Sequence, residues 1–265
     1  MVEHSVNGQE DSYMIKGLSL AGAFLAAVPM SIAAEAVDGL IGQWAFDEQH
    51  GEHAADTSGN GHDGSLINGA WGQGVEGGAL LLDGGNDGIV TISMADQIKE
   101  TRRSITLMAW TYRTDEHNVA VVASSYPMLF LGFHGPQFKL ELTERPGLLA
   151  RVAQKLGLAD EVEVECYADM AYVAELNRWI HLAATYDGEM ARLYADGQEV
   201  CALPFSGIIS FSDRPLTIGG YLDKNGSIVD EITGRIDDVR LYNRPLSADE
   251  VRAYFEDTGA LRMGQ

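Results

Sequence analysis

The sequence predicts an all-β fold, a two-sheet antiparallel jelly-roll sandwich that ends in a short C-terminal helix. Short apolar runs separated by Gly, Asn and Asp fill most of the chain, which contains 30 glycines in 265 residues. Two Asp-Gly pairs connect apolar runs at hairpin spacing. The strongest helix start lies close to the C-terminus. Together these features favour strands joined by tight turns in one medium-sized domain.

The apolar runs predict a series of short strands, each bounded by turn residues. In order, they cover residues 42–46, 79–82, 88–92, 104–112, 120–124, 129–133, 138–143, 162–167, 179–186, 189–195, 198–203, 216–219 and 234–242. Asp187-Gly188 and Asp196-Gly197 readily adopt the positive φ of type I′ turns, so residues 179–203 are predicted to form a three-stranded meander. Alternate residues from Ile180 to Tyr186 are expected to share one face.

The predicted C-terminal helix begins with a capping box. Ser247 and Glu250 have the spacing at which each side chain bonds the other residue's backbone N–H, and Leu246 and Val251 are placed as a hydrophobic staple. A second helix is predicted over residues 148–158, where apolar residues follow helical spacing.

The first 36 residues have the features of a secretory signal peptide. Lys16 precedes an apolar run over 17–32, and the segment ends in the small-x-small sequence Ala34-Glu-Ala36. The run is shorter than the ~20 residues of a membrane helix and contains Pro29. The alternative is a retained membrane anchor.

Cleavage after Ala36 predicts a mature domain over residues 37–265 that does not span a membrane. Because residues 1–13 are polar, Met14 is a candidate for the true start. The expected location is periplasmic or extracellular.

The charge excludes some partners. The chain has 39 acidic and 18 basic residues, a formal net charge of −21. Such a charge repels nucleic acid and anionic lipid surfaces. It is compatible with binding cations or neutral ligands, or it serves only to keep the protein soluble.

Cys166 and Cys201 are the two cysteines of the chain. In an exported protein such a pair can form a disulfide, and both residues fall in predicted strands. The alternative is two buried free thiols. No Cys or His spacing typical of a zinc site is present.

Residues 37–258 resemble the bacterial laminin-G-like, concanavalin A-like jelly-roll family. The matching segments are residues 43–47, 56–61, 79–84, 104–110, 179–188, 192–197, 216–219, 234–242 and 245–247. The resemblance implies two packed antiparallel sheets, frequent calcium binding, and roles in carbohydrate or protein recognition. It does not imply catalysis. Residues 144–160 depart from the family pattern, and this insertion either carries specificity or covers a sheet edge.

Asp56, Asn60, His62 and Asp237 form the predicted calcium site. Calcium takes six to eight oxygen ligands. Here the two carboxylates, the side chain or carbonyl of Asn60 and the carbonyl of His62 supply several of them. The resemblance implies the same assignment, because Asp56 and the first Asp of Ile236-Asp-Asp-Val match the family's metal positions.

The burial expected of Asp237 supports that assignment. Asp237 shares the parity of Val239 and Leu241, which are expected to face the core, and a buried carboxylate needs a cation or good donors. Alternatively, Asp56 caps its own turn and Asp237 pairs with an arginine.

Glu161, Glu163 and Glu165 are candidate catalytic residues. On a strand the three carboxylates share one face, with neighbours ~6.6 Å apart, and retaining glycosidases need two carboxylates ~5–5.5 Å apart. Laminarinase-type hydrolases are similar in using a Glu-x-Asp-x-Glu strand, but Glu163 replaces the Asp here. A solvated strand face predicts the same alternation.

The sequence therefore predicts a secreted, calcium-stabilised, non-catalytic module that binds a glycan or a surface protein. The alternatives are a hydrolase that uses the glutamate strand and an envelope or protein-interaction domain. Aromatic residues near predicted loops or strand ends are candidates for stacking on sugars. They are Tyr126, Phe133, His134, Tyr167, Tyr172 and Tyr221.

Overall fold

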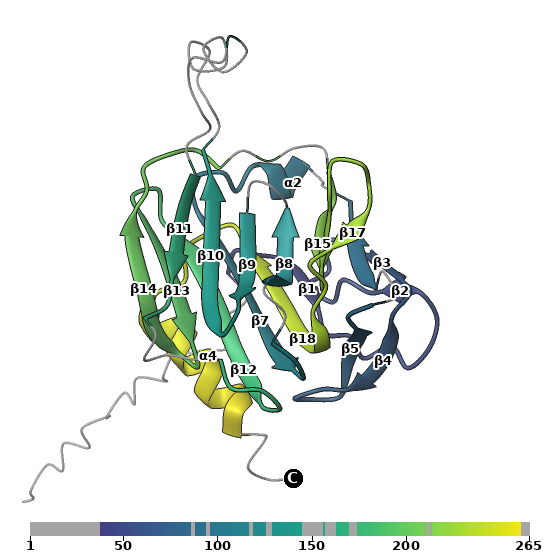
Figure 1. Ribbon diagram of the computed structural model, residues 1–265. Coiled ribbons are helices and arrows are strands. Elements are labelled where there is room, and N and C mark those ends of the chain that lie inside the picture. Colours follow the sequence, from purple (N-terminus) through teal and green to yellow (C-terminus); the bar gives the residue numbers. More distant parts are fainter. Residues whose placement is uncertain are drawn as a thin grey trace, which may run out of the picture. The chain divides into compact units, whose positions relative to one another are not determined.

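The computed structural model describes residues 38–85, 88–93, 96–116, 119–125, 129–144, 156, 163–169, 174–209, 211 and 214–260. These residues belong to one compact unit. The predicted signal peptide lies outside the described residues, as do Glu161 and, apart from residue 156, the predicted helix 148–158. The fold is mostly β, with two eight-stranded antiparallel sheets, which confirms the predicted fold class (Figure 1).

The first sheet, here sheet I, has the strand order β14-β13-β12-β7-β18-β5-β4, and β1 also pairs with β18. Its strands are β1 (Leu40–Trp44), β4 (Ala70–Gln73), β5 (Gly78–Asp83), β7 (Ile105–Arg113), β12 (Trp179–Tyr186), β13 (Met190–Ala195), β14 (Gln198–Pro204) and β18 (Thr233–Tyr242). β18, the last strand among the described residues, thus lies between strands from the first half of the chain.

The second sheet, here sheet II, has the order β11-β10-β9-β8-β15-β6-β3-β2. Its strands are β2 (His53–Ala54), β3 (Gly64–Ile67), β6 (Ile89–Ile92), β8 (Val119–Ser125), β9 (Leu129–His134), β10 (Gln137–Thr143), β11 (Glu163–Tyr167) and β15 (Leu216–Ile218). A small hairpin, β16 (Tyr221–Leu222) and β17 (Ile228–Val229), and a one-turn helix, α2 (Asp96–Lys99), complete the connections.

The core lies between the two sheets and takes alternate residues of each strand. On β12, the predicted face of Ile180, Leu182, Ala184 and Tyr186 belongs to this core, which confirms the period-two reading. Trp44 and Leu107 are fully buried among them.

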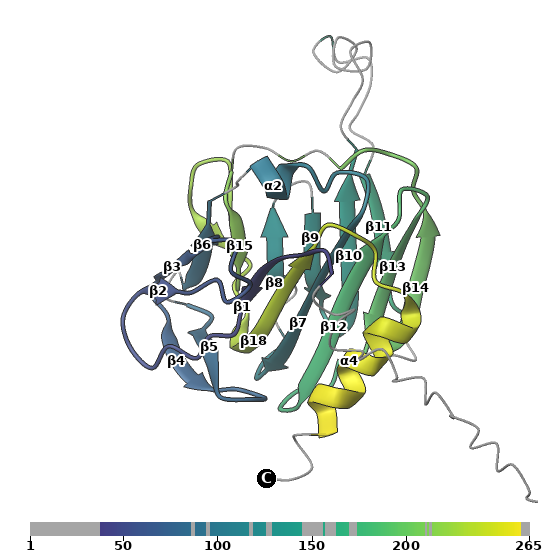
Figure 2. The same ribbon diagram turned by 180° about the vertical axis from the view of Figure 1, so that it is seen from behind.

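The C-terminal helix α4 (Ala248–Ala260) packs on the outer face of sheet I (Figure 2). The predicted capping box is confirmed: the Glu250 N–H donates to Ser247 Oγ at 3.2 Å, and the Ser247 N–H donates to Glu250 Oε2 at 2.7 Å. Val251 and Tyr254 bury a second apolar cluster against Trp110 and neighbouring residues. No described helix has the length and apolar character needed to cross a membrane.

The predicted meander is confirmed, but its two turns differ. Asp196 and Gly197 both have positive φ, 48° and 74°, as a type I′ turn requires. At the first turn only Gly188 has positive φ, and Asp187 instead accepts hydrogen bonds from the N–H groups of Glu189 and Met190. The type I′ prediction was therefore wrong for Asp187, because its side chain stabilises a longer turn.

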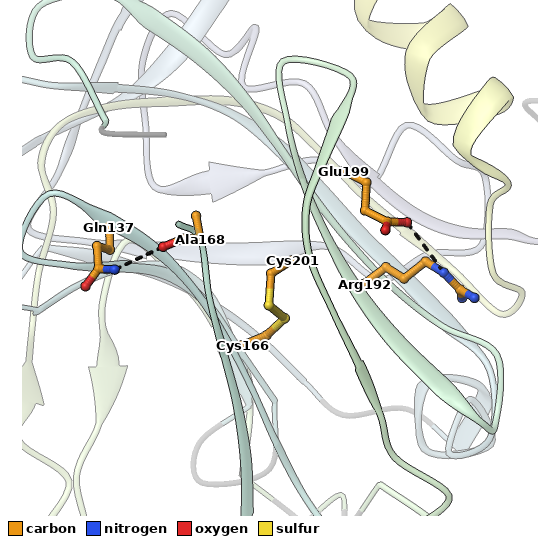
Figure 3. The surroundings of a disulfide bond; sticks show 6 residues. All are labelled: Gln137, Cys166, Ala168, Arg192, Glu199 and Cys201. Atoms are coloured by element: carbon orange, nitrogen blue, oxygen red, sulfur yellow. Dashed lines mark hydrogen bonds and ion pairs between the residues drawn. A yellow bond between two sulfur atoms is a disulfide. The ribbon is translucent and has the colours of Figure 1, made fainter. Parts of the chain in front are cut away.

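The predicted disulfide between Cys166 and Cys201 is present (Figure 3). The two cysteines lie on β11 and β14, which are edge strands of different sheets, with Cα atoms 6.0 Å apart. The bond therefore closes one edge of the sandwich across its two layers. Beside it, Gln137 Nε2 donates to the carbonyl of Ala168 at 3.0 Å, which holds the end of β11 to β10.

Candidate functional site

The outer face of sheet II carries a row of polar and aromatic side chains across five strands. Register places Thr217, Ser124, Phe130, Glu141 and Glu165 directly opposite one another on β15, β8, β9, β10 and β11. Their chain neighbours alternate into the core, so this row faces away from it. Figure 1 shows β8 to β11 side by side in this sheet. Thr217, Ser124, Phe130 and Glu141 are nevertheless buried, and of these five residues only Glu165, at the β11 end of the row, is exposed. We call the outer side of these strands the sheet II face.

Three carboxylates and one lysine form the charged centre of the sheet II face. Oxygens of Glu141, Glu163 and Glu165 lie within 4.8 Å of one another. The Nζ atom of Lys139 is 2.6 Å from Glu141 Oε2 and 2.7 Å from Glu165 Oε1. Lys139 and Glu141 are two residues apart on β10, so both point to the same side, and Glu165 lies opposite Glu141 on β11. Lys139 thus bridges carboxylates of two strands.

Aromatic side chains flank this centre. Lys139 Nζ lies 5.2 Å from the ring centre of Phe130 and 5.6 Å from that of Tyr167. His134 Nδ1 is 3.3 Å from the Tyr167 hydroxyl. Tyr167 is half-buried and His134 is exposed at the strand end, so the two rings form an accessible border beside the charges.

Burial tunes the charges of this cluster. Removal from water and a hydrogen bond with Glu163 raise the pKa of Glu141 to about 7, although Lys139 opposes this shift. Burial works against the charge of Lys139, but its hydrogen bonds with Glu141 and Glu165 raise the pKa of Lys139 above its ordinary value. The hydrogen bond from Lys139 lowers the pKa of Glu165. At neutral pH the face therefore presents a cation, an ionised carboxylate and a carboxyl group close to its midpoint.

The Asp56 loop lies against β1. Asp56 Oδ1 accepts from the N–H groups of Gln43 at 3.0 Å and Ser58 at 2.9 Å, and Oδ2 accepts from the His62 N–H at 2.9 Å. Burial disfavours the charge of Asp56, but these hydrogen bonds lower its pKa. Asp56 therefore holds its own loop onto β1.

The other two predicted loop ligands also make protein contacts. The carbonyl of His62 accepts from the Trp44 indole at 2.9 Å. Asn60 Nδ2 donates to the carbonyl of Leu40 at 3.1 Å and to Ser58 Oγ at 3.1 Å. These bonds fasten the loop to β1 at several points.

Asp237 is buried, with 2% of its surface exposed, but not in the core between the sheets. A bulge at Asp238, where φ is 43°, lets both Ile236 and Val239 face the core, so the predicted parity was wrong. Asp237 Oδ2 instead accepts from the Val75 N–H at 2.7 Å.

The partners of Asp237 are backbone donors rather than the arginine of the alternative reading. Its Oδ2 also accepts from the Glu76 N–H at 3.3 Å, while the arginine of this region, Arg240, pairs with Asp238 at 2.9 Å. Burial raises the pKa of Asp237 to about 7. A bound cation would favour its ionised form.

One carboxylate oxygen beside the Asp56 loop fits a cation. Glu48 Oε1 accepts from the Ala55 N–H at 2.7 Å, while the buried Oε2 has no hydrogen-bond partner in the part of the chain that the structure describes. An unpartnered buried carboxylate oxygen costs free energy unless a cation or donor meets it. The loop thus keeps one hard oxygen ligand of the kind calcium prefers.

Residues 83–252 match the family model of the concanavalin A-like lectin/glucanases superfamily. The chain belongs to this superfamily. No curated protein matches its sequence significantly. The matched range includes the sheet II face and Asp237, whereas the Asp56 loop precedes it.

Solved structures share the fold at low sequence identity. The binding domain of botulinum neurotoxin DC in complex with SialylT is 15% identical, with a TM-score of 0.62 over 86% of this chain and 52% of that one. The same domain in complex with rat synaptotagmin II is 14% identical, with a TM-score of 0.60 over 84% of this chain and 52% of that one. A third structure is domain 4 of AbnA, a GH43 extracellular arabinanase from Geobacillus stearothermophilus, in complex with arabinotriose. It is 16% identical, with a TM-score of 0.58 over 81% of this chain and 97% of that one. The chain therefore spans about half the length of the toxin binding domains.

In this member of the superfamily, the sequence predicted two of the four residues of the charged centre, Glu163 and Glu165. Glu163 and Glu165 lie on the sheet II face, and Glu161 lies outside the described residues. It missed Lys139 and Glu141 on the neighbouring strand. The signal was present in the predicted strand 138–143, where polar residues alternate with apolar ones.

The described candidate sugar-stacking residues lie in different parts of the structure. His134 and Tyr167 lie on the sheet II face, and Tyr221 is half-buried on β16. Phe133 packs in the core against Phe138, so its prediction as a stacking residue was wrong. Tyr126 and Tyr172 lie outside the described residues.

Proposed function

We propose that the chain is a non-catalytic carbohydrate-binding module whose sheet II face holds the glycan. The observation that carries the proposal is the placement of the Tyr167 and His134 rings beside Lys139 and its carboxylates on an outward sheet face. Aromatic rings stack on the apolar faces of sugars, and charged hydrogen-bonding groups orient the hydroxyls. Within an acidic chain, this composition favours a neutral glycan.

Two further observations support a binding role in an exported protein. Two structures of the same fold are complexes with sugars: the botulinum neurotoxin DC binding domain with SialylT, and domain 4 of AbnA with arabinotriose. The disulfide suits an oxidising compartment, in agreement with the proposed signal peptide and a periplasmic or extracellular location.

Replacement of Tyr167 by Ala is expected to weaken glycan binding about tenfold, ~1.4 kcal/mol, because the ring that stacks on the sugar is lost. Calorimetric titration of the full chain with neutral oligosaccharides, arabinan and galactan fragments first, measures this change. Trp71→Ala, which removes a half-buried ring from β4 of sheet I, is the matched control. Equal weakening by both variants, or none by Tyr167→Ala, would contradict a glycan site on this face.

A hydrolase is the second candidate, favoured by one feature of the same face. Glu141 has a pKa raised to about 7 and lies within 4.8 Å of two other carboxylates, near the ~5–5.5 Å separation of retaining glycosidases. Glu141 would then act as the acid and Glu163 or Glu165 as the nucleophile. The titrated oligosaccharides are analysed for new reducing ends. Products that disappear in Glu141→Gln would assign catalysis, and intact sugars would leave a binding module.

We also propose that calcium stabilises the Asp56 loop, with Glu48 Oε2 as one of its ligands and oxygens of Asp56, Asn60 and His62 as further ligands. Support comes from the unpartnered position of Glu48 Oε2 beside the loop. Asp237 would join the site only if its Oδ1 atom turned to the same ion.

Calcium is expected to raise the melting temperature of the full chain, and a chelator to reverse the rise, because an ion that binds only the folded state stabilises it. Glu48→Gln keeps the acceptor for Ala55 but removes the charge, and it should abolish the response. Asp237→Ala abolishes it only if Asp237 is a ligand. Identical melting curves with calcium and with chelator would reject the site.

A further inference from the structure

The outer face of sheet I carries a second group of aligned side chains, beside the area that α4 covers. Register places Leu81, Arg235, Tyr112 and Trp179 directly opposite one another on β5, β18, β7 and β12. Their chain neighbours Leu80, Ile236 and Ile180 point into the core. We call these four residues the sheet I stripe. With strands ~4.8 Å apart, it extends about 14 Å, which is long enough for an oligosaccharide.

The side chains of the stripe contact one another in sequence. The rings of Trp179 and Tyr112 have centroids 5.5 Å apart in an edge-to-face arrangement. The Cζ atom of Arg235 lies 5.2 Å from the ring centre of Tyr112. Leu81 is exposed, and the other three residues are half-buried. The stripe is therefore a pre-ordered surface of rings, one guanidinium and one aliphatic side chain.

The partners of Arg235 differ from those of two other arginines of the same sheet. Arg192 and Arg240, on strands of the same sheet, have carboxylate oxygens at 2.7 and 2.9 Å. Arg235 has no ion-pair partner among the described residues, and its contacts are the Tyr112 ring and the carbonyl of Gln73 at 3.3 Å. The Arg235 guanidinium is thus not neutralised by a described carboxylate, and the Tyr112 ring beneath it holds it in place.

We propose that the sheet I stripe is a second carbohydrate site, specific for a short sugar chain that carries a carboxylate. The sugar ring stacks on Tyr112 and Trp179, and Arg235 pairs with the carboxylate through two parallel hydrogen bonds. A ligand with a sugar ring and a carboxylate is of uronic acid type. The net charge of −21 opposes long polyanions such as nucleic acids, so the ligand is a short oligomer. This site lies on the opposite sheet from the sheet II face and stands independently of its function.

Calorimetric titration of the full chain with uronate trimers tests the proposal. Galacturonate, mannuronate and guluronate trimers are each compared with their methyl esters, which keep the rings and lose the charge. One acid trimer should bind about tenfold more tightly than its ester, and the preference should decrease with added salt. Absence of binding to every acid trimer, or equal affinity for acid and ester, would overturn the proposal.

Variants locate the binding. Arg235→Gln should abolish the preference for the acid, and Arg235→Lys should retain only part of it, because lysine cannot bind a carboxylate through a planar fork. Arg252→Gln, which removes an equal charge from α4, is the control and should bind as the wild type does. Tyr112→Leu should weaken acid and ester alike, with melting curves to check folding. Loss of acid binding in Tyr167→Ala but not in Arg235→Gln would place the ligand on the sheet II face and refute the stripe.

Discussion

Removal of the Cys166–Cys201 bond is expected to lower the free energy of unfolding by about 3 kcal/mol. The bond closes a chain segment with a sequence separation of 35 residues, and such a cross-link restricts the unfolded chain. β11 is an edge strand that pairs only with β10 in sheet II, and this bond is its covalent link to sheet I. Chemical denaturation of the Cys166→Ser/Cys201→Ser double variant measures the loss.

The wild type under a thiol reductant is the matched comparison and should unfold at the same denaturant concentration as the double variant. Hydrogen exchange should also accelerate more at β11 than at β9, which has a partner strand on both sides. A loss below about 1 kcal/mol would show that side-chain packing alone holds the edge of the sandwich.

Replacement of Lys139 by Met is expected to destabilise the protein by about 3–5 kcal/mol. Lys139 and Glu141 keep only 12% and 7% of their side chains exposed, and removal of one member of such a pair leaves a buried charge uncompensated. Thermal and denaturant unfolding at pH 8 measure the loss. The double variant Lys139→Met/Glu141→Gln should recover most of it, because the unpaired charge is then absent.

The same pair sets a pH dependence with a defined sign. The folded-state pKa of Glu141, about 7, lies above its ordinary value of 4.5, so the folded protein binds more protons between these values. Stability from this group is therefore fully present below pH ~4.5 and is lost as pH rises towards 7. Lys139→Met should deepen this loss, and Glu141→Gln should remove it. An Lys139→Met variant equally destabilised at pH 5 and pH 8 would contradict the role of Glu141.

The strands of the meander show which parts of the fold can be predicted from local sequence patterns. Residues 179–186 were predicted with the same bounds as β12, because the period-two pattern of side chains and the Asp-Gly turns are encoded within a few neighbouring residues. The capping box of α4 was equally local. β2, β3 and β4 were missed, because they are two to four residues long and contain polar or Gly-rich sequence. Their pairing with longer strands, rather than their own propensity, makes them strands.

The sequence by itself determined the fold class and the family, since both depend on residue type and order, but it left open whether Cys166 and Cys201 are bonded. Only the tertiary structure decided which residues meet. A bulge at Asp238 turned Asp237 away from the core, and strand register brought Lys139 and Glu141 of β10 beside Glu163 and Glu165 of β11. It likewise aligned Arg235 with Tyr112, residues more than a hundred positions apart. Register depends on how both sheets pack around the shared core, and no local segment contains that information.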